Sequence, residues 1–548
     1  MIEGRDIAPR IDRLLAIVLL SIAVGLLAMQ SSSLFVFPLP NSLRWFGDET
    51  WLMLEAKSQM TTGVVRYPLA IGSALEQSKG VVLSMTWLSS LLYGTPVAIL
   101  HADPVDIGRI VTATLAVLLC AALFICAKRM GASRYSAALA VLLLISSRSF
   151  FFASHSCRTD LLAGLIVLCV VSILGGMIKG QKRPEGPWWL WFGAAMTFLA
   201  VSSSIHLLTL LAPVSLYFVW RLGGFAKMTN ILRAGLGCAC VLIVFISLYR
   251  LSVGNLSLFS PSSVGHTQFH DVLSSIPILR PFSRSVQTSN ILIRIRQFTT
   301  EAPQAYLLLL LTPCVGPLGR IRKIWSSTIL PDSFAWPVVI VLLSWLLLEG
   351  AEVNYLIQVL PLFVLLLAIV ASKAISYSPR FTYGLLTLIG SIFFVLALRD
   401  SLAASAYAGA IDSSNASAIT QIEAAITRTW TGHSKPRVVT EPPTLERLTQ
   451  ATSIEVMTDH FISFPLREEP LDSFVKREHI DYFVLYNSPV YPKNRSANDP
   501  FYQDVKRLGS LQATIIGTSG DVSRDYFHNS NWKDTLLLIK VEDRHGRN

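Results

Sequence analysis

Long runs of apolar residues constrain the fold of this chain more than any other feature. Runs at 14–37, 161–178 and 334–348 have the length and the low charge content of bilayer-spanning helices. Inside a bilayer each segment has to satisfy its own backbone hydrogen bonds, so these runs predict α-helices. Of the 548 residues, 52% are hydrophobic and only 15% are charged, which excludes an ordinary soluble protein. We therefore predict a mainly α, polytopic membrane protein.

The Lys and Arg residues predict how the helices are oriented. Arg5, Arg10 and Arg13 precede the first run, which predicts a cytoplasmic N-terminus. The net charge of +11 is then a signal of topology and of contact with anionic lipids, and not of nucleic-acid binding. Placing every later cationic cluster on the cytoplasmic side gives about eleven spans. These are 14–37, 107–127, 135–153, 161–178, 188–203, 205–220, 235–253, 303–319, 333–350, 355–371 and 381–398.

The apolar segment 81–100 is excluded from these spans. Counting it would place the later cationic clusters outside, so we expect it to lie along the interface or to re-enter, with Trp87 and Tyr93 near the headgroups. The alternative is an ordinary span with a broken charge rule. With 81–100 excluded, the loops 38–106 and 254–300 and the C-terminus are external.

The composition changes after Asp400, which predicts a membrane domain at 1–400 and a separate domain at 401–548. Short β-rich runs at 437–440, 454–457, 482–486, 513–516 and 535–541 alternate with helical stretches at 444–451, 471–478 and 501–508. This pattern predicts a small α/β domain with a largely parallel sheet. It contains no glycine-rich phosphate motif, so we expect an external accessory domain that modulates the chemistry.

Two acidic residues open the first external loop. Asp48 and Glu49 precede an amphipathic helical pattern that ends near Gly63. Asp48 is a good helix-capping residue, and capping alone would explain its presence. Acids at the mouth of a membrane helix are nevertheless costly to desolvate unless they have a partner or a function.

A second polar group, Arg158 with Asp160, follows the span 135–153. Under the predicted topology it lies on the same external face as Asp48. Taken alone, Asp160 would cap the next helix and Arg158 would bind headgroups. The occurrence of two such loops on one face favours a site.

Several motifs resemble the C-type (GT-C) glycosyltransferases that use polyprenyl-phosphate sugars, in particular protein O-mannosyltransferases and lipid A aminoarabinose transferases. Gly47-Asp48-Glu49 resembles the acidic motif of the first external loop of this family. Glu76 and Lys79 resemble a Glu-Lys pair of the aminoarabinose branch, where the two are adjacent. Arg158-Thr159-Asp160 resembles an Arg-x-Asp motif, and Tyr355 begins a Tyr-Leu…Pro segment similar to one in a late helix of these enzymes.

This resemblance implies a GT-C fold and a set of site residues. Asp48, with Glu49 as a substitute, would be the general base on the acceptor hydroxyl, and Asp160 would assist. Arg158 and Lys79 would cover the phosphate, and Glu76 and Tyr355 would bind substrate. Arg280 is added as a substrate-binding candidate because it lies in the predicted external loop 254–300 near the membrane surface. Asp160 with Asp48 as oxygen ligands of a divalent cation is left open, and no other cofactor is predicted.

The predicted function is transfer of a sugar from a polyprenyl-phosphate donor to an envelope acceptor on the external face, with inversion at the anomeric centre. The acceptor would be a lipid, a glycan or a protein. The expected location is a bacterial inner membrane, with the C-terminal domain periplasmic. The alternatives are a transporter or flippase of lipid-linked sugars and a non-catalytic envelope assembly protein.

Overall fold

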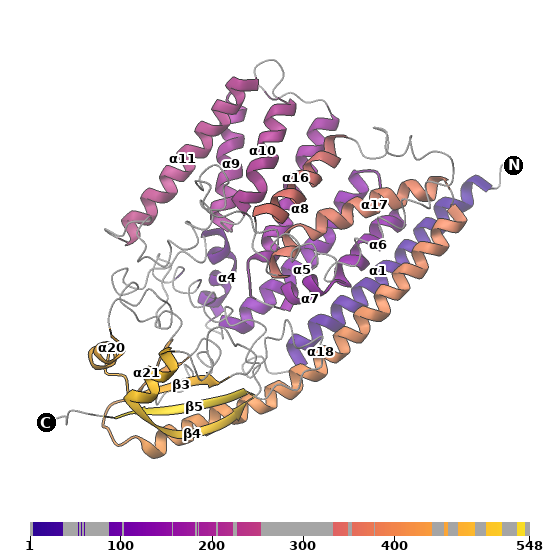
Figure 1. Ribbon diagram of the computed structural model, residues 1–548. Coiled ribbons are helices and arrows are strands. Elements are labelled where there is room, and N and C mark those ends of the chain that lie inside the picture. The colour runs from indigo at the N-terminus through magenta and orange to yellow at the C-terminus, as the bar shows by residue number, and fades with distance from the viewer. Residues whose placement is uncertain are drawn as a thin grey trace.

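The chain folds into a helix bundle with a small sheet domain at one end (Figure 1). This computed structural model describes residues 4–36, 53, 56, 60, 87–100, 104–155, 157–180, 184, 186–203, 207–222, 227–253, 332–348, 353–377, 379–440, 454–458, 470–487, 500–517 and 534–542. The helices of the bundle are α1 (Gly4–Val36), α4 (Trp87–Leu100), α5 (Pro104–Arg129), α6 (Arg134–Ile145), α7 (Arg148–His155), α8 (Asp160–Lys179), α9 (Trp188–Ser203), α10 (Leu207–Leu222), α11 (Lys227–Val253), α16 (Asp332–Leu348), the 3₁₀ helix η3 (Val353–Gln358), α17 (Leu360–Tyr377) and α18 (Pro379–Thr429).

The predicted polytopic helix bundle is confirmed. Among the described residues, segments of α1, α5, α8, α11 and α18 are long and apolar enough to cross a membrane, and the bent pair α6–α7 would be a sixth crossing. α9, α10, α16 and α17 contain shorter apolar segments. The predicted span 303–319 lies outside the described residues. Exposed apolar side chains such as Leu14, Val24 and Ile243 suit contact with lipid.

One end of the bundle is organised around Asp12 near the start of α1. Its carboxylate accepts hydrogen bonds from the backbone N–H groups of Arg134 (3.1 Å) and Tyr135 (3.3 Å) at the start of α6, and from the hydroxyl of Tyr383 in α18 (3.2 Å). A carboxylate at a helix N-terminus is stabilised by the exposed N–H groups there. Lys128, in the last turn of α5, bonds the nearby carbonyl of Ala132 at 2.8 Å. Lys128 and Arg134 thus lie at the end of the bundle that the sequence predicts to be cytoplasmic.

α4 contains the described part, residues 87–100, of the apolar segment 81–100. At the end opposite Asp12, the backbone oxygen of Gln30 in α1 contacts His155, and Gly108 in α5 lies beside Cys157. α1 therefore leaves the bundle, and α5 enters it, at the same end. The 14 residues of α4 extend only about 21 Å, whereas a hydrocarbon core is about 30 Å thick. Residues 81–86 lie outside the described residues, and the non-spanning position of 81–100 stays a prediction.

The backbones of α9 and α11 lie so close together that only glycine fits at two positions of their contact. A Cβ atom added to Gly193 in α9 would lie 2.0 Å from the carbonyl oxygen of Ala234, and one added to Gly237 in α11 would lie 2.0 Å from that of Leu190. Small residues permit this approach, and in a membrane the resulting van der Waals contact is a main source of helix association.

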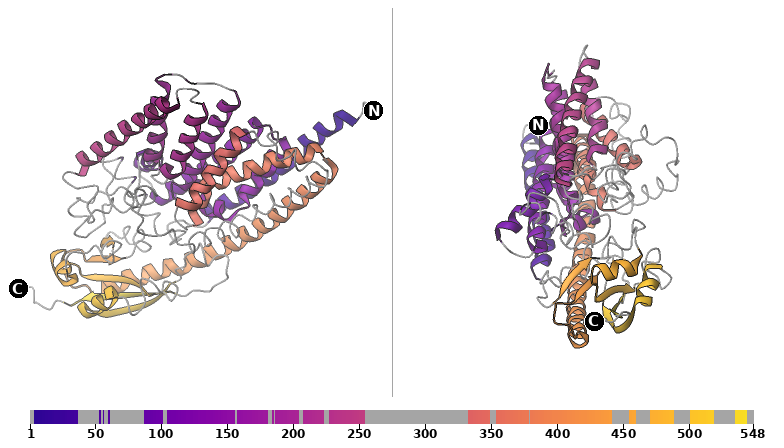
Figure 2. Two further views of the ribbon diagram at one scale, coloured as in Figure 1. Left: turned by 45° about the horizontal axis from the view of Figure 1, so that its top comes forward. Right: turned by 90° about the vertical axis from the view of Figure 1, so that its left-hand side faces the viewer.

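α18 connects the bundle to the sheet domain without a break. Its 51 residues pass through position 400, where the composition changes, and continue to Thr429. Figure 2 shows from two further directions that this helix leaves the bundle and reaches the sheet. The hydroxyl of Thr429 bonds that of Tyr482 at 2.9 Å, and Lys540 donates to the carbonyl of Thr429 at 2.6 Å. The end of α18 is thus part of the C-terminal domain.

The sheet of this domain has the strand order β2-β1-β3-β5-β4, and β1 is parallel to both β2 and β3. β5 is antiparallel to both β3 and β4, so the prediction of a largely parallel sheet is wrong for this half. The sequence pattern contains no helix between these last two strands, and antiparallel neighbours need no crossover helix. The elements are β1 (Arg437–Thr440), β2 (Glu455–Thr458), α20 (Leu471–Arg477), β3 (Tyr482–Asn487), α21 (Pro500–Leu508), β4 (Gly509–Gly517) and β5 (Asp534–Val541).

The glycine contact between α9 and α11 can be tested with two substitutions in one helix. Gly237→Ala should destabilise the protein by about 1–3 kcal/mol, because the added methyl overlaps a backbone carbonyl that cannot rotate away. Gly235→Ala is the control, since a Cβ at Gly235 meets nothing within 4 Å. The measurement is unfolding of the purified protein in mixed detergent micelles. Equal stability of the two variants would contradict the close contact.

Candidate active site

The candidate site begins with a bend in the chain between α6 and α7, which meet at 67°. Two serines form the break. Ser146 is the C-cap of α6, and Ser147 donates from Oγ to the carbonyl of Leu144 (2.8 Å) while accepting from the N–H of Phe150 (3.2 Å). Ser147 thereby caps the N-terminus of α7, as serines commonly do. This bend sets the direction in which α7 leads to residues 157–160.

The last residue of α7, His155, is fixed by contacts on both ring nitrogens. Nδ1 lies 2.7 Å from the carbonyl oxygen of Phe151 and 3.0 Å from Oγ of Ser154, and Nε2 lies 2.8 Å from the carbonyl oxygen of Gln30. The imidazole also stacks on the ring of Phe151 at 4.2 Å. His155 is 1% exposed, so it anchors α7 to α1 from within the protein.

Arg158 and Asp160 form a nearly buried ion pair at the start of α8. Nε of Arg158 lies 2.8 Å from Oδ2 of Asp160, and their side chains are 11% and 5% exposed. The second carboxylate oxygen, Oδ1, accepts from Nε2 of Gln358 in η3 at 3.1 Å. The N-cap of α8 is Thr159, and Asp160 is the first helical residue. Asp160 therefore uses both oxygens to hold side chains and does not serve as the cap.

Close backbone packing brings η3 to this ion pair. Gly164, one turn into α8, lies against the carbonyl of Ile357, and a Cβ there would be 2.6 Å from that oxygen. Gln358 is completely buried. Tyr355, predicted to bind substrate, lies in η3 three residues before Gln358.

α4 and α5 enclose the other side of Arg158. The Tyr93 hydroxyl donates to the backbone carbonyl of Arg158 at 2.9 Å and lies 3.2 Å from Oγ1 of Thr112. Both Tyr93 and Thr112 are fully buried. Tyr93 is thus a support for the Arg158 loop, whereas the sequence predicted that it would lie at the headgroups.

Part of the first external loop packs against the same helices. Met53 and Ala56 are helical and fully buried. The sulfur of Met53 lies against Gly108 of α5, beside the sulfur of Cys157, and the carbonyl of Ala56 lies against Gly94 of α4. The loop that contains the predicted acids is therefore connected to the Arg158 region. Asp48 and Glu49 themselves, together with Glu76, Lys79 and Arg280, lie outside the described residues.

Arg109 is a further candidate that the sequence analysis did not single out. It lies in the second turn of α5, between Gly108 and Thr112, and is 1% exposed. A cation within an apolar run is itself a signal of function, because its burial is costly without an anionic group nearby. The sequence interpretation assigned 107–127 to an apolar span and overlooked this charge.

The described part of this site contains the Arg158–Asp160 ion pair, and the buried Arg109 lies in the neighbouring helix α5. The planar fork of an arginine suits phosphate oxygens. Asp160 and Gln358 fix the orientation of the fork. Within the described residues no group of three or more His, Cys, Asp or Glu side chains could hold a metal ion.

No protein-family model and no curated protein sequence matches this chain. Solved structures do match over almost the whole length. One is ArnT from Cupriavidus metallidurans bound to undecaprenyl phosphate, with a TM-score of 0.55 and 12% identity, covering 96% of this chain and 98% of that chain. The apo state of ArnT has a TM-score of 0.54 at 12% identity, covering 94% and 97%. ArnT is a lipid A aminoarabinose transferase with a GT-C fold. The resemblance inferred from the sequence motifs is therefore confirmed for the fold, and this chain has the fold of the C-type (GT-C) membrane glycosyltransferases.

Proposed function

We propose that this protein is an integral-membrane glycosyltransferase that transfers a sugar from a polyprenyl-phosphate donor to an envelope acceptor on the external face. The observation that carries the proposal is the buried Arg158–Asp160–Gln358 group within a GT-C fold. The solved ArnT structure with this fold contains undecaprenyl phosphate. A phosphate also suits the planar fork of Arg158, which can donate to two of its oxygens.

The chemistry assigns different tasks to the two ends of the reacting bond. As the bond between the anomeric carbon and the phosphate oxygen breaks, negative charge grows on the lipid phosphate, and Arg158 would stabilise it. Because Arg158 is already held by Asp160, little reorganisation is needed at that moment. Lys79 and Arg280 are proposed to add further positive charge, with Glu76 and Tyr355 in contact with substrate.

The acceptor hydroxyl is a weak nucleophile and requires a base. We propose that Asp48, with Glu49 beside it, takes the hydroxyl proton as the oxygen attacks the anomeric carbon. Attack opposite the departing phosphate inverts the configuration at that carbon. In this scheme the membrane domain, 1–400, performs the transfer, and the domain 401–548, which would be periplasmic in a bacterial inner membrane, is accessory.

Substitution of Arg158 tests the phosphate role. Arg158→Ala should lower turnover by about 10²–10³-fold and also weaken binding of the lipid phosphate, because the phosphate is charged before and during transfer. Arg158→Lys should recover only part of each loss, since an ammonium lacks the planar fork. The assay is transfer from a purified polyprenyl-phosphate sugar together with binding of the polyprenyl phosphate alone. Arg129→Ala at the opposite end of the bundle is the control, and an equal loss there would refute the assignment.

Substitution of Asp48 tests the base. Asp48→Asn preserves size and capping ability but cannot accept the proton, so turnover should fall by about 10²–10⁴-fold while lipid binding persists. Asp472→Asn, on an exposed turn of α20, provides the matched change of charge. Near-normal turnover of a stable Asp48→Asn protein would mean that Asp48 only caps a helix, and it would refute the proposed mechanism.

A further inference from the structure

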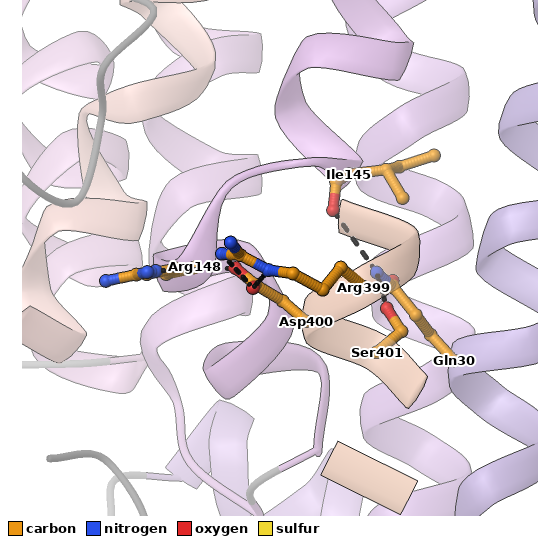
Figure 3. A network of polar contacts seen from close by, with 6 residues as sticks. All are labelled: Gln30, Ile145, Arg148, Arg399, Asp400 and Ser401. Atoms are coloured by element: carbon orange, nitrogen blue, oxygen red, sulfur yellow. Dashed lines mark hydrogen bonds and ion pairs between the residues drawn. The ribbon is translucent and has the colours of Figure 1, made fainter. Parts of the chain in front are cut away.

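A group of polar contacts at the α6–α7 bend lies outside the candidate site but next to the helix that leads to it. Figure 3 shows that the group joins three parts of the chain that are far apart in sequence, namely α1, the bend, and α18. It is formed by the side chains of Gln30, Arg148, Asp400 and Ser401, with the carbonyl of Ile145. The proposed reaction uses none of these residues.

Gln30 contacts both sides of the bend. Its side-chain Nε2 donates to the carbonyl of Ile145 at 3.4 Å and to Oγ of Ser401 at 3.2 Å. The first of these oxygens belongs to the last residue of α6, where a helix leaves carbonyls without intrahelical partners. The backbone oxygen of Gln30 contacts His155 at the far end of α7. Gln30 is 2% exposed, so one residue of α1 fixes α7 relative to α6 from the interior.

Asp400 holds the beginning of α7. Its Oδ2 lies 3.5 Å from Nε of Arg148, the first residue of α7, and the two side chains are 19% and 30% exposed. Its other oxygen, Oδ1, pairs with Arg399 at 2.7 Å, which is 64% exposed. Asp400 and Ser401 are consecutive in α18, so a single turn of this helix contacts both α7 and α1.

The same helix carries the C-terminal domain. From Asp400 to Thr429 the helix extends for about 44 Å, and its end is bonded to β3 and β5 through Tyr482 and Lys540. Helical backbone hydrogen bonds make such a segment stiff, so a displacement of the sheet domain is transmitted along it. At the other end of α7, Arg158 follows His155 by three positions in the sequence.

We infer that Asp400, Ser401 and Gln30 are positioning residues, which orient Arg158 and Asp160 by holding α7, and that α18 couples this orientation to the C-terminal domain. This inference rests on the proposed function, because that function gives Arg158 its role in binding the lipid phosphate. The contacts between α18 and α7 do not depend on that function. It assigns the accessory domain a role: a partner that shifts the domain would change the fit of the site to a lipid phosphate.

The test compares two partners of one carboxylate. Asp400→Asn and Arg148→Gln should each raise the KM for the lipid donor by about tenfold. The double variant should have the same KM as either single variant, because both substitutions remove the same ion pair. Asp400→Glu should restore the wild-type KM, since it keeps the charge. Arg399→Gln is the control: it also removes a partner of Asp400 but leaves α7 in place. A merely structural contact would lower the unfolding midpoint and the active fraction without changing KM.

A second readout does not depend on activity. In Asp400→Asn, amide hydrogen exchange at 157–163 should be about tenfold faster than in wild type, while exchange in Arg399→Gln stays unchanged. Unaltered exchange at 157–163 in Asp400→Asn, or an equal rise of KM in Arg399→Gln, would overturn the inference. Absence of transfer by the wild-type protein would instead overturn the proposed function, and the exchange measurement would still decide whether Asp400 orders residues 157–163.

Discussion

In a bilayer, every peptide group needs a hydrogen-bond partner within the protein, and the rest of this structure follows from that requirement. Most of the described chain meets it with continuous helices. The helical pattern is interrupted between α6 and α7 and changes to a 3₁₀ helix in η3. Ser147 satisfies the groups released at the first of these points, and Gln358 at the end of the second extends to Asp160. The polar chemistry of the candidate site gathers where regular helix stops.

The two ends of the bundle differ in how far their charged side chains are removed from solvent. At the end marked by Asp12, cations lie near the surface and cap or solvate helix ends. At the other end Asp160 accepts from the nearly buried Arg158, whereas Asp400 accepts from Arg399, which is 64% exposed. Buried ion pairs contribute little net stability after desolvation, but loss of one partner is costly. A pair such as Arg158–Asp160 therefore fixes the geometry of its side chains more than it stabilises the fold.

The sequence was most informative where the signal is local. Hydropathy placed a helix at 188–203 with the same bounds as α9, and the spacing of Arg158 and Asp160 suggested a common location. It could not reveal Gln358, because that residue joins Asp160 from 198 positions away. The continuation of α18 to Thr429 was also missed, since residues after 400 lose the hydrophobic run while remaining rich in the helix former Ala. Arg109 could have been found, because a lone charge in an apolar run is visible in the sequence.

The contact between Gln30 and Ser401 spans 371 positions, and this separation has a consequence for biosynthesis. Membrane helices enter the bilayer in order as the ribosome delivers them, so α1 and α7 are in place long before α18 emerges. Until that helix arrives, the bend has none of the contacts from Asp400 and Ser401. Contacts of such long range form late and slowly, and the unfinished polar surface is exposed to misassembly meanwhile. The bend thus acquires its mature contacts only after nearly three quarters of the chain has been synthesised.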